Sequence, residues 1–111
     1  MKIVINACYG GFSLSKEAIL LARQLSGNPT WGDVVLAGEK YSDGSLKIVI
    51  INSYHPNIKR TDKILVQVVE QLKDKAYGAC ASLEIRRVCG KYRINQFDGY
   101  EYIEREDTEK D

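Results

Sequence analysis

The stretch NACYGGFSLS at residues 6–15 decides how this chain folds, because it separates a predicted strand from a predicted helix. Residues 1–5 form a short segment rich in β-branched apolar side chains, which favours a strand. Residues 16–25 carry apolar side chains at helical spacing. Ser15 stands where a helix N-cap is needed, so we expect the helix to begin there.

The turn inside this stretch contains Gly10 and Gly11, which permit backbone conformations that other residues avoid. A strand, a glycine turn and a helix start can together hold an anion, because free backbone N–H groups and the helix dipole face it. The turn has neither the Gly-Lys-Ser/Thr ending nor the G-x-G-x-x-G spacing of known phosphate loops. The alternative is a tight turn that only starts a helix.

The middle of the chain predicts a β-hairpin arm. Residues 34–37 and 46–51 favour strands, and residues 42–45 supply turn chemistry between them. Residues 48–51 are apolar on both faces, which implies burial on both sides or contact with a partner subunit. Trp31 either anchors that contact or belongs to the core.

The second half of the chain predicts a helix from Thr61-Asp62 to about Lys75, followed by strands over 80–88, 92–97 and 100–104. Asp98-Gly99 is a strong hairpin signal between the last two strands. Simple alternation assigns one face of these strands to Ala81, Leu83, Ile85, Tyr92, Ile94, Tyr100 and Tyr102. It assigns the opposite face to Glu84, Arg86, Arg93, Asn95, Phe97 and Glu101.

These elements predict an α+β fold. We expect a mostly antiparallel sheet, made of the N-terminal strand plus a C-terminal three-stranded meander, with two helices on one face and a β-hairpin arm. A chain of 111 residues forms one domain. That domain should span residues 1–105, with a charged tail at 106–111.

Composition excludes several function classes. Sixteen Lys and Arg against fifteen Asp and Glu give a net charge of +1, so no global field favours a nucleic-acid polymer or a membrane surface. No apolar run approaches the length of a membrane span. The three cysteines lack metal-type spacing and the chain has one histidine, so we expect no metal and no cofactor. Reduced cysteines in a cytoplasm are the default expectation.

Catalytic residues are hard to identify in this sequence. His55 lies in a Pro-containing loop without a nucleophile motif beside it. Cys8 stands close to a helix N-terminus, where a thiol can be activated, but a small buried hydrophobe is the more common role of a free cysteine. We therefore expect no catalytic set.

Binding is better provided for than catalysis. Tyr9 and Phe12 offer ring faces beside the glycine turn, while Arg60, Arg86 and Arg93 offer guanidinium groups. Rings that stack on a base and guanidinium groups that hold phosphate suit a nucleotide. The alternative is that the tyrosines straddle core and surface and that the arginines have no role beyond the surface.

The chain resembles a family of small phage and prophage proteins, through the pattern N-x-C-Y-G-G-F-x-L-S at residues 6–15. The second half agrees in K-R-T-D at 59–62, L-V-x-V-V-E-x-L at 65–72, G-x-C-A-x-L at 78–83 and F-D-G-Y-E at 97–101. The resemblance covers residues 2–27 and 58–104, whereas the segment 28–57 and Lys63 depart from the family's pattern.

The family is similar to the anti-Thoeris sponge proteins. Those relatives are oligomers that sequester the cyclic ADP-ribose signal of a bacterial TIR defence system without cleaving it, and some also bind cyclic oligonucleotides, the signals of CBASS defence. The resemblance implies a phage anti-defence protein that acts in the host bacterial cytoplasm. It also implies a homo-oligomer, either a dimer or a trimer of dimers, whose subunit boundaries enclose the ligand.

Seven residues are the candidate ligand-binding set. Tyr9, Gly10, Gly11 and Phe12 would supply the turn and the ring contacts, Arg60 and Arg93 the phosphate contacts, and Asn95 a contact to a sugar or base edge. One alternative is a protein–protein inhibitor of a bacterial defence complex that uses the exposed strand or the arm. Another is a small hydrolase of a nucleotide signal that uses Cys8 or His55.

Overall fold

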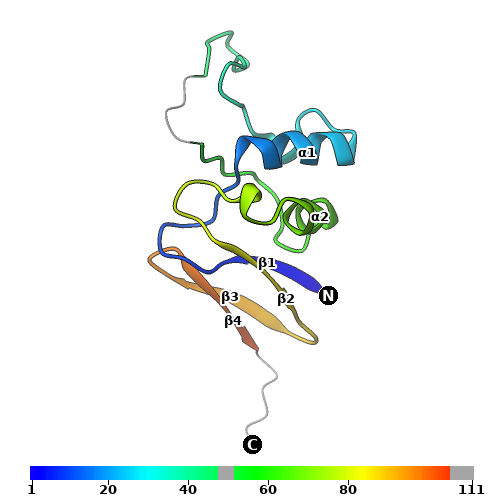
Figure 1. Cartoon of the computed structure of the whole chain (residues 1–111), viewed down its shortest axis with the longest axis vertical. Helices are drawn as coiled ribbons and strands as arrows, with labels where there is room; N and C mark the ends of the chain where they lie inside the picture. Colours follow the sequence, from blue (N-terminus) through cyan, green and yellow to red (C-terminus); the bar gives the residue numbers. More distant parts are fainter. Residues whose placement is uncertain (48–51, 106–111) are drawn as a thin grey trace, which may run out of the picture.

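The computed structural model describes residues 1–47 and 52–105 and has the α+β class that the sequence predicts (Figure 1). Its elements, in chain order, are β1 (Lys2–Asn6), α1 (Lys16–Ser26), the 3-10 turn η1 (Trp31–Asp33), α2 (Lys63–Leu72), the 3-10 turn η2 (Lys73–Ala76), β2 (Leu83–Arg87), β3 (Tyr92–Phe97) and β4 (Tyr100–Arg105). β1 pairs with β2, and β3 pairs with β4.

Helix α1 begins and ends where the sequence predicts. The Ser15 hydroxyl accepts a hydrogen bond from the Ala18 backbone N–H at 3.1 Å, which satisfies one of the free donors of the first turn. At the other end Gly27 adopts the left-handed conformation, with φ 69°, that commonly stops a helix. Ala18, Ile19 and Ala22 face the core.

Helix α2 begins as predicted but ends at Leu72, earlier than the predicted Lys75. The Asp62 carboxylate caps it by accepting from the backbone N–H groups of Ile64 and Leu65. Lys73 then takes φ 53°, which ends the regular helix, and a 3-10 turn follows. This turn brings the carbonyl of Ala76 to the Ser15 N–H at 2.9 Å, so the end of the second helical segment supports the start of the first.

The sheet pairing corrects the predicted three-stranded meander. β2 pairs with β1, with Val4 opposite Ile85, and not with β3. β1 is buried on both faces, because it contacts α2 and also lies against β4. Its apolar residues therefore need β2 as a neighbour inside the core, which leaves β3 and β4 as a separate hairpin. Both helices lie on one side of β1 and β2, as predicted (Figure 1).

The register of the last hairpin corrects the predicted face of β4. The two-residue turn Asp98-Gly99 places Phe97 directly opposite Tyr100, so these two side chains share a face, and the next pair on it is Asn95 opposite Tyr102. The intervening Glu101 therefore points to the other face. It is 7% exposed, whereas simple alternation places it on the face of Arg93 and Phe97.

The predicted arm is present as a short hairpin over residues 38–47, in which Tyr41 N–H donates to the Ser45 carbonyl. The predicted strand at 34–37 is wrong. Val34 and Leu36 are buried there in a segment without strand pairing. Trp31 belongs to the core, at 4% exposed. The predictions for residues 48–51 and for the tail at 106–111 lie outside the described residues.

An ion pair fixes the arm to α1. The Arg23 guanidinium donates to both carboxylate oxygens of Glu39, at 2.6 and 3.1 Å, and Glu39 also accepts from the Leu36 N–H. These hydrogen bonds, that from Arg23 first, lower the pKa of Glu39 to about 2. A carboxylate with a lowered folded-state pKa stabilises the fold above its unfolded pKa and loses that contribution as the pH falls.

We expect Glu39→Gln to remove part of the acid sensitivity of the protein. The stability advantage of the native protein over the variant should shrink as the pH falls from about 5 to about 2, because only the native Glu39 takes up a proton there. The Glu39 side chain is 41% exposed, so the change should stay below about 1 kcal/mol. Urea unfolding at three pH values in this range measures it. A difference that stays constant with pH would contradict the assigned role.

Candidate functional site

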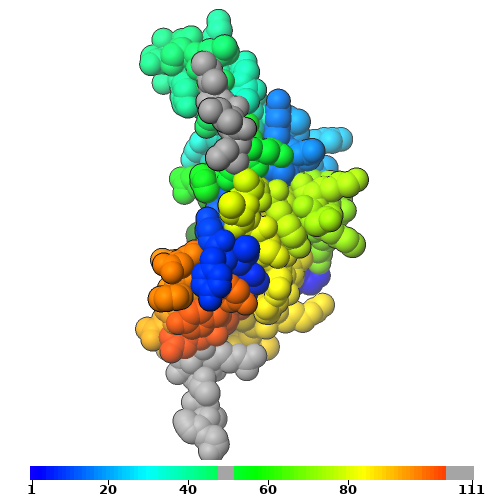
Figure 2. Space-filling model, turned by 60° about the vertical axis from the view of Figure 1, so that its left-hand side comes forward, coloured from blue at the N-terminus to red at the C-terminus, as the bar shows by residue number. Residues whose placement is uncertain are grey.

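The glycine turn packs against the C-terminal hairpin rather than standing alone. Gly10 N–H donates to the Asp98 carbonyl at 3.1 Å, and Ala7 N–H donates to the Ser82 carbonyl at 2.7 Å. Figure 2 shows the N-terminal segment, in blue, at the surface beside the hairpin, in orange. Segments from the two ends of the sequence therefore make one continuous surface.

The two turns approach each other so closely that a side chain does not fit between them. A Cβ added to Gly99 would lie 2.2 Å from the Gly11 backbone nitrogen. Gly99 also has φ +85°, which L-residues rarely adopt. Gly44 in the arm has nearly the same φ, +90°, but a Cβ there would meet nothing within 4 Å.

This pair of glycines separates backbone strain from close packing. We expect Gly44→Ala to cost about 1 kcal/mol of unfolding free energy, because only the left-handed conformation is penalised. Gly99→Ala should cost about 1–2 kcal/mol more, since overpacking adds to the same penalty. Chemical denaturation of both variants measures the difference. Equal losses would mean that the two turns do not pack as closely as described.

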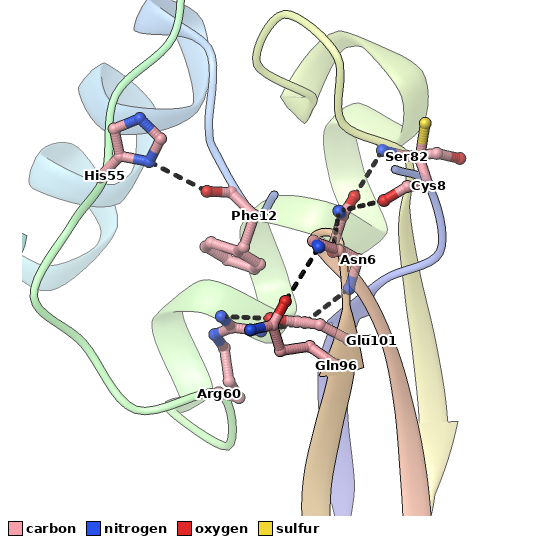
Figure 3. A network of polar contacts seen from close by, with 9 residues as sticks. Asn6, Cys8, Phe12, His55, Arg60, Ser82, Gln96 and Glu101 are labelled. Carbon is pink, nitrogen blue, oxygen red and sulfur yellow. Dashed lines mark hydrogen bonds and ion pairs between the residues drawn. The ribbon is translucent and has the colours of Figure 1, made fainter. Parts of the chain in front are cut away.

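Asn6, the last residue of β1, connects three segments from a fully buried position. Its side-chain amide donates to the carbonyls of Cys8 at 2.7 Å and of Gly99 at 2.8 Å, and its side-chain oxygen accepts from the Ser82 N–H at 2.9 Å. Figure 3 shows these contacts converging on the end of the strand. One side chain thus fixes the shape of the turn and the position of the hairpin.

The anion held next to this turn is a carboxylate of the chain itself. Glu101 accepts from the Asn6 backbone N–H at 2.8 Å and from both terminal nitrogens of Arg60, one of them at 2.7 Å (Figure 3). The Arg60 guanidinium also lies 3.8 Å from the centre of the Phe12 ring, within cation–π range. A backbone N–H and a guanidinium therefore surround a carboxylate of the chain here. The expected anion pocket at the N–H groups of the glycine turn stays a prediction.

An exposed cluster of aromatic side chains lies over the junction of the two turns. We call Tyr9, Phe97 and Tyr100 the ring group. The Tyr9 ring centre lies 6.5 Å from that of Phe97 and 5.3 Å from that of Tyr100. The three residues are 61%, 66% and 38% exposed, and Tyr102, on the same face of the hairpin, is 50% exposed. Large rings clustered on a surface mark a binding surface more often than isolated ones do.

The structure brings some of the candidate residues together and separates others. Tyr9, Gly10 and Gly11 lie at the ring group, and Phe12 lies under Arg60. In one chain Arg93 lies four residues before Phe97, about 13 Å along the strand. The role of Arg60 as a phosphate ligand stays a prediction, since both its terminal nitrogens donate to Glu101.

Arg93 and Asn95 share one acceptor at the far end of the hairpin. The Glu104 carboxylate accepts from Arg93 Nε at 2.8 Å and from Asn95 Nδ2 at 2.5 Å. These two hydrogen bonds, that from Arg93 first, lower the pKa of Glu104. The Arg93 side chain is 61% exposed.

Sequence reasoning missed Phe97 and Tyr100 as members of the site, and Glu101 as a buried group. The signal was present in Asp98-Gly99, because a two-residue hairpin places its flanking residues opposite each other on one face. Alternation counted along each strand separately loses this relation across the turn.

The two candidate catalytic side chains each contact a main-chain carbonyl. His55 is exposed, and its Nδ1 lies 3.0 Å from the Phe12 carbonyl oxygen. The Cys8 thiol lies 3.4 Å from the carbonyl of its neighbour Tyr9. Within residues 1–47 and 52–105, no group of three or more His, Cys, Asp or Glu side chains could hold a metal ion.

Surface hollows lie elsewhere on the molecule. Three surface hollows of about 440, 520 and 510 Å³ are lined by residues of α2 or of the segment just before it, together with parts of β1 and β2. None of the three is lined by the ring group.

In the part of the chain described, no helix has the length and apolar character needed to cross a membrane.

Comparison with known proteins finds no matching family model, no matching curated protein and no matching solved structure.

Proposed function

We propose that this protein binds a cyclic nucleotide signal on the ring group and sequesters it without cleaving it. The observation that carries the proposal is the clustering of three exposed aromatic residues at the junction of the glycine turn and the hairpin. Stacking of a base on an aromatic side chain contributes about 1–3 kcal/mol and needs no particular base, because every base has a π face.

The backbone beside the rings favours close approach by a ligand. A Cβ added to Gly11 would meet nothing within 4 Å, so the turn is open on that side. A ribose or phosphate of a stacked nucleotide can therefore reach the main chain there. Gly10 cannot take part through its N–H in the same way, because that donor is already bonded to Asp98.

The chemistry around the rings supports binding rather than turnover. His55 Nδ1 contacts the Phe12 carbonyl, and the Cys8 thiol contacts the Tyr9 carbonyl. In these contacts neither side chain is paired with a second side chain as nucleophile and base. A protein that sequesters a signal has to leave it intact. Hydrolysis of the ligand is the competing function that the experiment below distinguishes.

The motif resemblance specifies the ligand class. Similarity to anti-Thoeris sponges favours a cyclic ADP-ribose isomer, with cyclic oligonucleotides as a second class. It also favours a phage anti-defence role in the host bacterial cytoplasm and a homo-oligomeric assembly. A second copy would help to enclose the ligand, since the ring group of one chain lies on an open surface.

A retention experiment tests this function. The purified protein is incubated with cyclic ADP-ribose isomers, and in a parallel sample with cyclic dinucleotides; free ligand is then removed and the protein is heat-denatured. Recovery of intact ligand supports sequestration. Recovery of altered ligand supports the hydrolase instead, and no retention of either class favours inhibition of a defence complex by protein–protein contact.

We expect Tyr9→Ala to weaken ligand binding by about 5- to 150-fold, which corresponds to the loss of one stacked ring. Tyr41→Ala is the matched control, because Tyr41 is 43% exposed but lies in the arm. Isothermal titration of both variants measures the affinities. Comparable losses in the two variants, or none in Tyr9→Ala, would remove the ring group from the binding site.

A further inference from the structure

The outer edge of β3 is open. Among residues 1–47 and 52–105, β3 has β4 as its only strand neighbour, while β4 also lies against β1. Phe97 and Tyr100 flank a two-residue turn and form a hydrogen-bonded pair. Phe97 and every second residue before it in β3 therefore direct their backbone N–H and C=O groups toward β4. The backbone groups of Tyr92, Ile94 and Gln96 therefore point to the open edge.

This edge lacks the usual protection against pairing. Natural edge strands carry Lys, Pro or bulges that prevent another strand from adding. β3 has the sequence YRINQF, with neither Lys nor Pro and with Arg93 as its one charged residue. A sheet of two strands is also only marginally stable by itself, so a further strand would stabilise the hairpin.

We propose that β3 of a second copy of this chain adds to this edge, antiparallel, about a two-fold axis at Asn95. The result is a continuous four-stranded sheet in the order β4, β3, β3, β4, with the aromatic face of both hairpins on the same side. Pairing through the same strand in both chains is isologous and closes after two copies.

Two features of β3 determine this register: its side chains alternate between two faces, and Arg93 is its one charged residue. Opposed residues share a face, so Arg93, Asn95 and Phe97 can only oppose one another. Pairing Asn95 with Asn95 places each Arg93 opposite Phe97 of the other copy, which is a favourable cation–aromatic pair. Pairing Arg93 with Arg93 would oppose like charges. Pairing Arg93 with Asn95 would leave Phe97, at 66% exposed, beyond the paired segment.

A second copy of β3 fits this edge better than an unrelated strand for the same reason. In the Asn95-centred register, Ile94 of each copy lies opposite Gln96 of the other copy. Residues 93–97 of the two copies then pair without placing two charges opposite each other. The single Arg93 of each chain then meets a ring rather than another cation. This self-complementarity commits the edge to a second copy.

The pairing also completes the site, a consequence that rests on the proposed function. Arg93, which lies away from Tyr9 within one chain, comes to lie beside Phe97 of the other copy and so beside that copy's ring group. The Arg93 guanidinium keeps its Nε contact to Glu104 and comes to lie beside the rings. Rings from one chain and a cation from the other then suit the base and the phosphate of a single nucleotide.

Cysteine cross-linking tests the interface and its register. In the full chain with Cys8, Cys80 and Cys89 replaced by serine, Asn95→Cys is oxidised with copper-phenanthroline. We expect a covalent dimer, because residues opposed in a pair of this kind have Cβ atoms about 4.5–5.5 Å apart. Ile94→Cys, the neighbouring position on the other face, should cross-link at least tenfold less. Failure of Asn95→Cys to cross-link, or preferential cross-linking of Ile94→Cys, would overturn the proposal.

Sedimentation and ligand retention separate this proposal from the proposed function. We expect the native chain to sediment at twice its monomer mass. Ile94→Pro removes a backbone N–H at the open edge, so this variant should sediment as a monomer while its circular dichroism spectrum stays that of the folded protein. A native chain that is monomeric would overturn the interface even if it retained ligand. A cross-linked dimer that retains no ligand would overturn the function and leave the interface standing.

Discussion

Replacing Asn6 with alanine is expected to lower the free energy of unfolding by about 3 kcal/mol or more. The side chain is fully buried and serves the Cys8 carbonyl, the Gly99 carbonyl and the Ser82 N–H at once. Without it, three polar groups lose a partner, and each loss costs about 1–3 kcal/mol where water cannot replace the bond. The effect should exceed that of any surface asparagine.

Asn57→Ala is the matched control for this prediction. Asn57 is exposed and makes one side-chain hydrogen bond, to Asp33 at 3.2 Å, so its loss should cost less than about 1 kcal/mol. Urea unfolding monitored by circular dichroism measures both variants. If Asn6→Ala were no less stable than Asn57→Ala, the end of β1 would not organise the turn and the hairpin.

Breaking the ion pair between Arg60 and Glu101 is expected to have the second large effect. Glu101 is 9% exposed at its side chain and Arg60 is 25% exposed, so removing either partner leaves the other largely desolvated. We expect each single alanine variant to lose about 3 kcal/mol. In the double-mutant cycle the coupling energy should be about 2–3 kcal/mol, because the second substitution removes the charge that the first one left unpaired.

Arg86 and Glu84 provide a control cycle with the same residue types. Both side chains are exposed, at 46% and 41%, so their coupling energy should stay below about 1 kcal/mol. Chemical denaturation of the four proteins in each cycle supplies the values. Equal coupling in the two cycles would show that the Arg60 pair is not desolvated and does not secure the hairpin.

The helices could be predicted from the sequence because their signals are local. Ser15, Asp62 and Gly27 act within one turn of the residues that they cap or stop, and the structure uses all three in that way. Strand pairing depends instead on which segments meet in space. β2 pairs with a strand far away in sequence, and no property of β2 alone distinguishes that partner from the adjacent β3.

Part of the candidate site could also be predicted. The glycine turn and Tyr9 stand out in the sequence, and they do lie at an exposed aromatic surface. The place of Glu101 could not be read from alternation, because its burial follows from packing of the hairpin against Asn6 and Arg60. Arg60 lies just before a helix N-terminus, where the dipole disfavours a cation, so the sequence predicts a carboxylate or phosphate partner for it. It does not indicate whether that anion belongs to the chain or to a ligand.

The two ends of the sequence meet at one surface, and this is the physical basis of the proposed function. Asn6 and Glu101 hold the hairpin against the glycine turn. That contact places Tyr9, from the first ten residues, beside Phe97 and Tyr100, from the last fifteen. Loss of the contact should therefore weaken ligand binding even in a variant that keeps all three rings.

An NMR titration of the aromatic resonances with a cyclic ADP-ribose isomer tests binding at the ring group most directly. Stacking of the base should shift the ring protons of Tyr9, Phe97 and Tyr100 upfield in a saturable way, while those of Tyr41 stay unchanged. Saturable shifts centred on Tyr41 or on the hollows along α2, with the ring group unaffected, would contradict the account, as would the absence of any shift with both ligand classes.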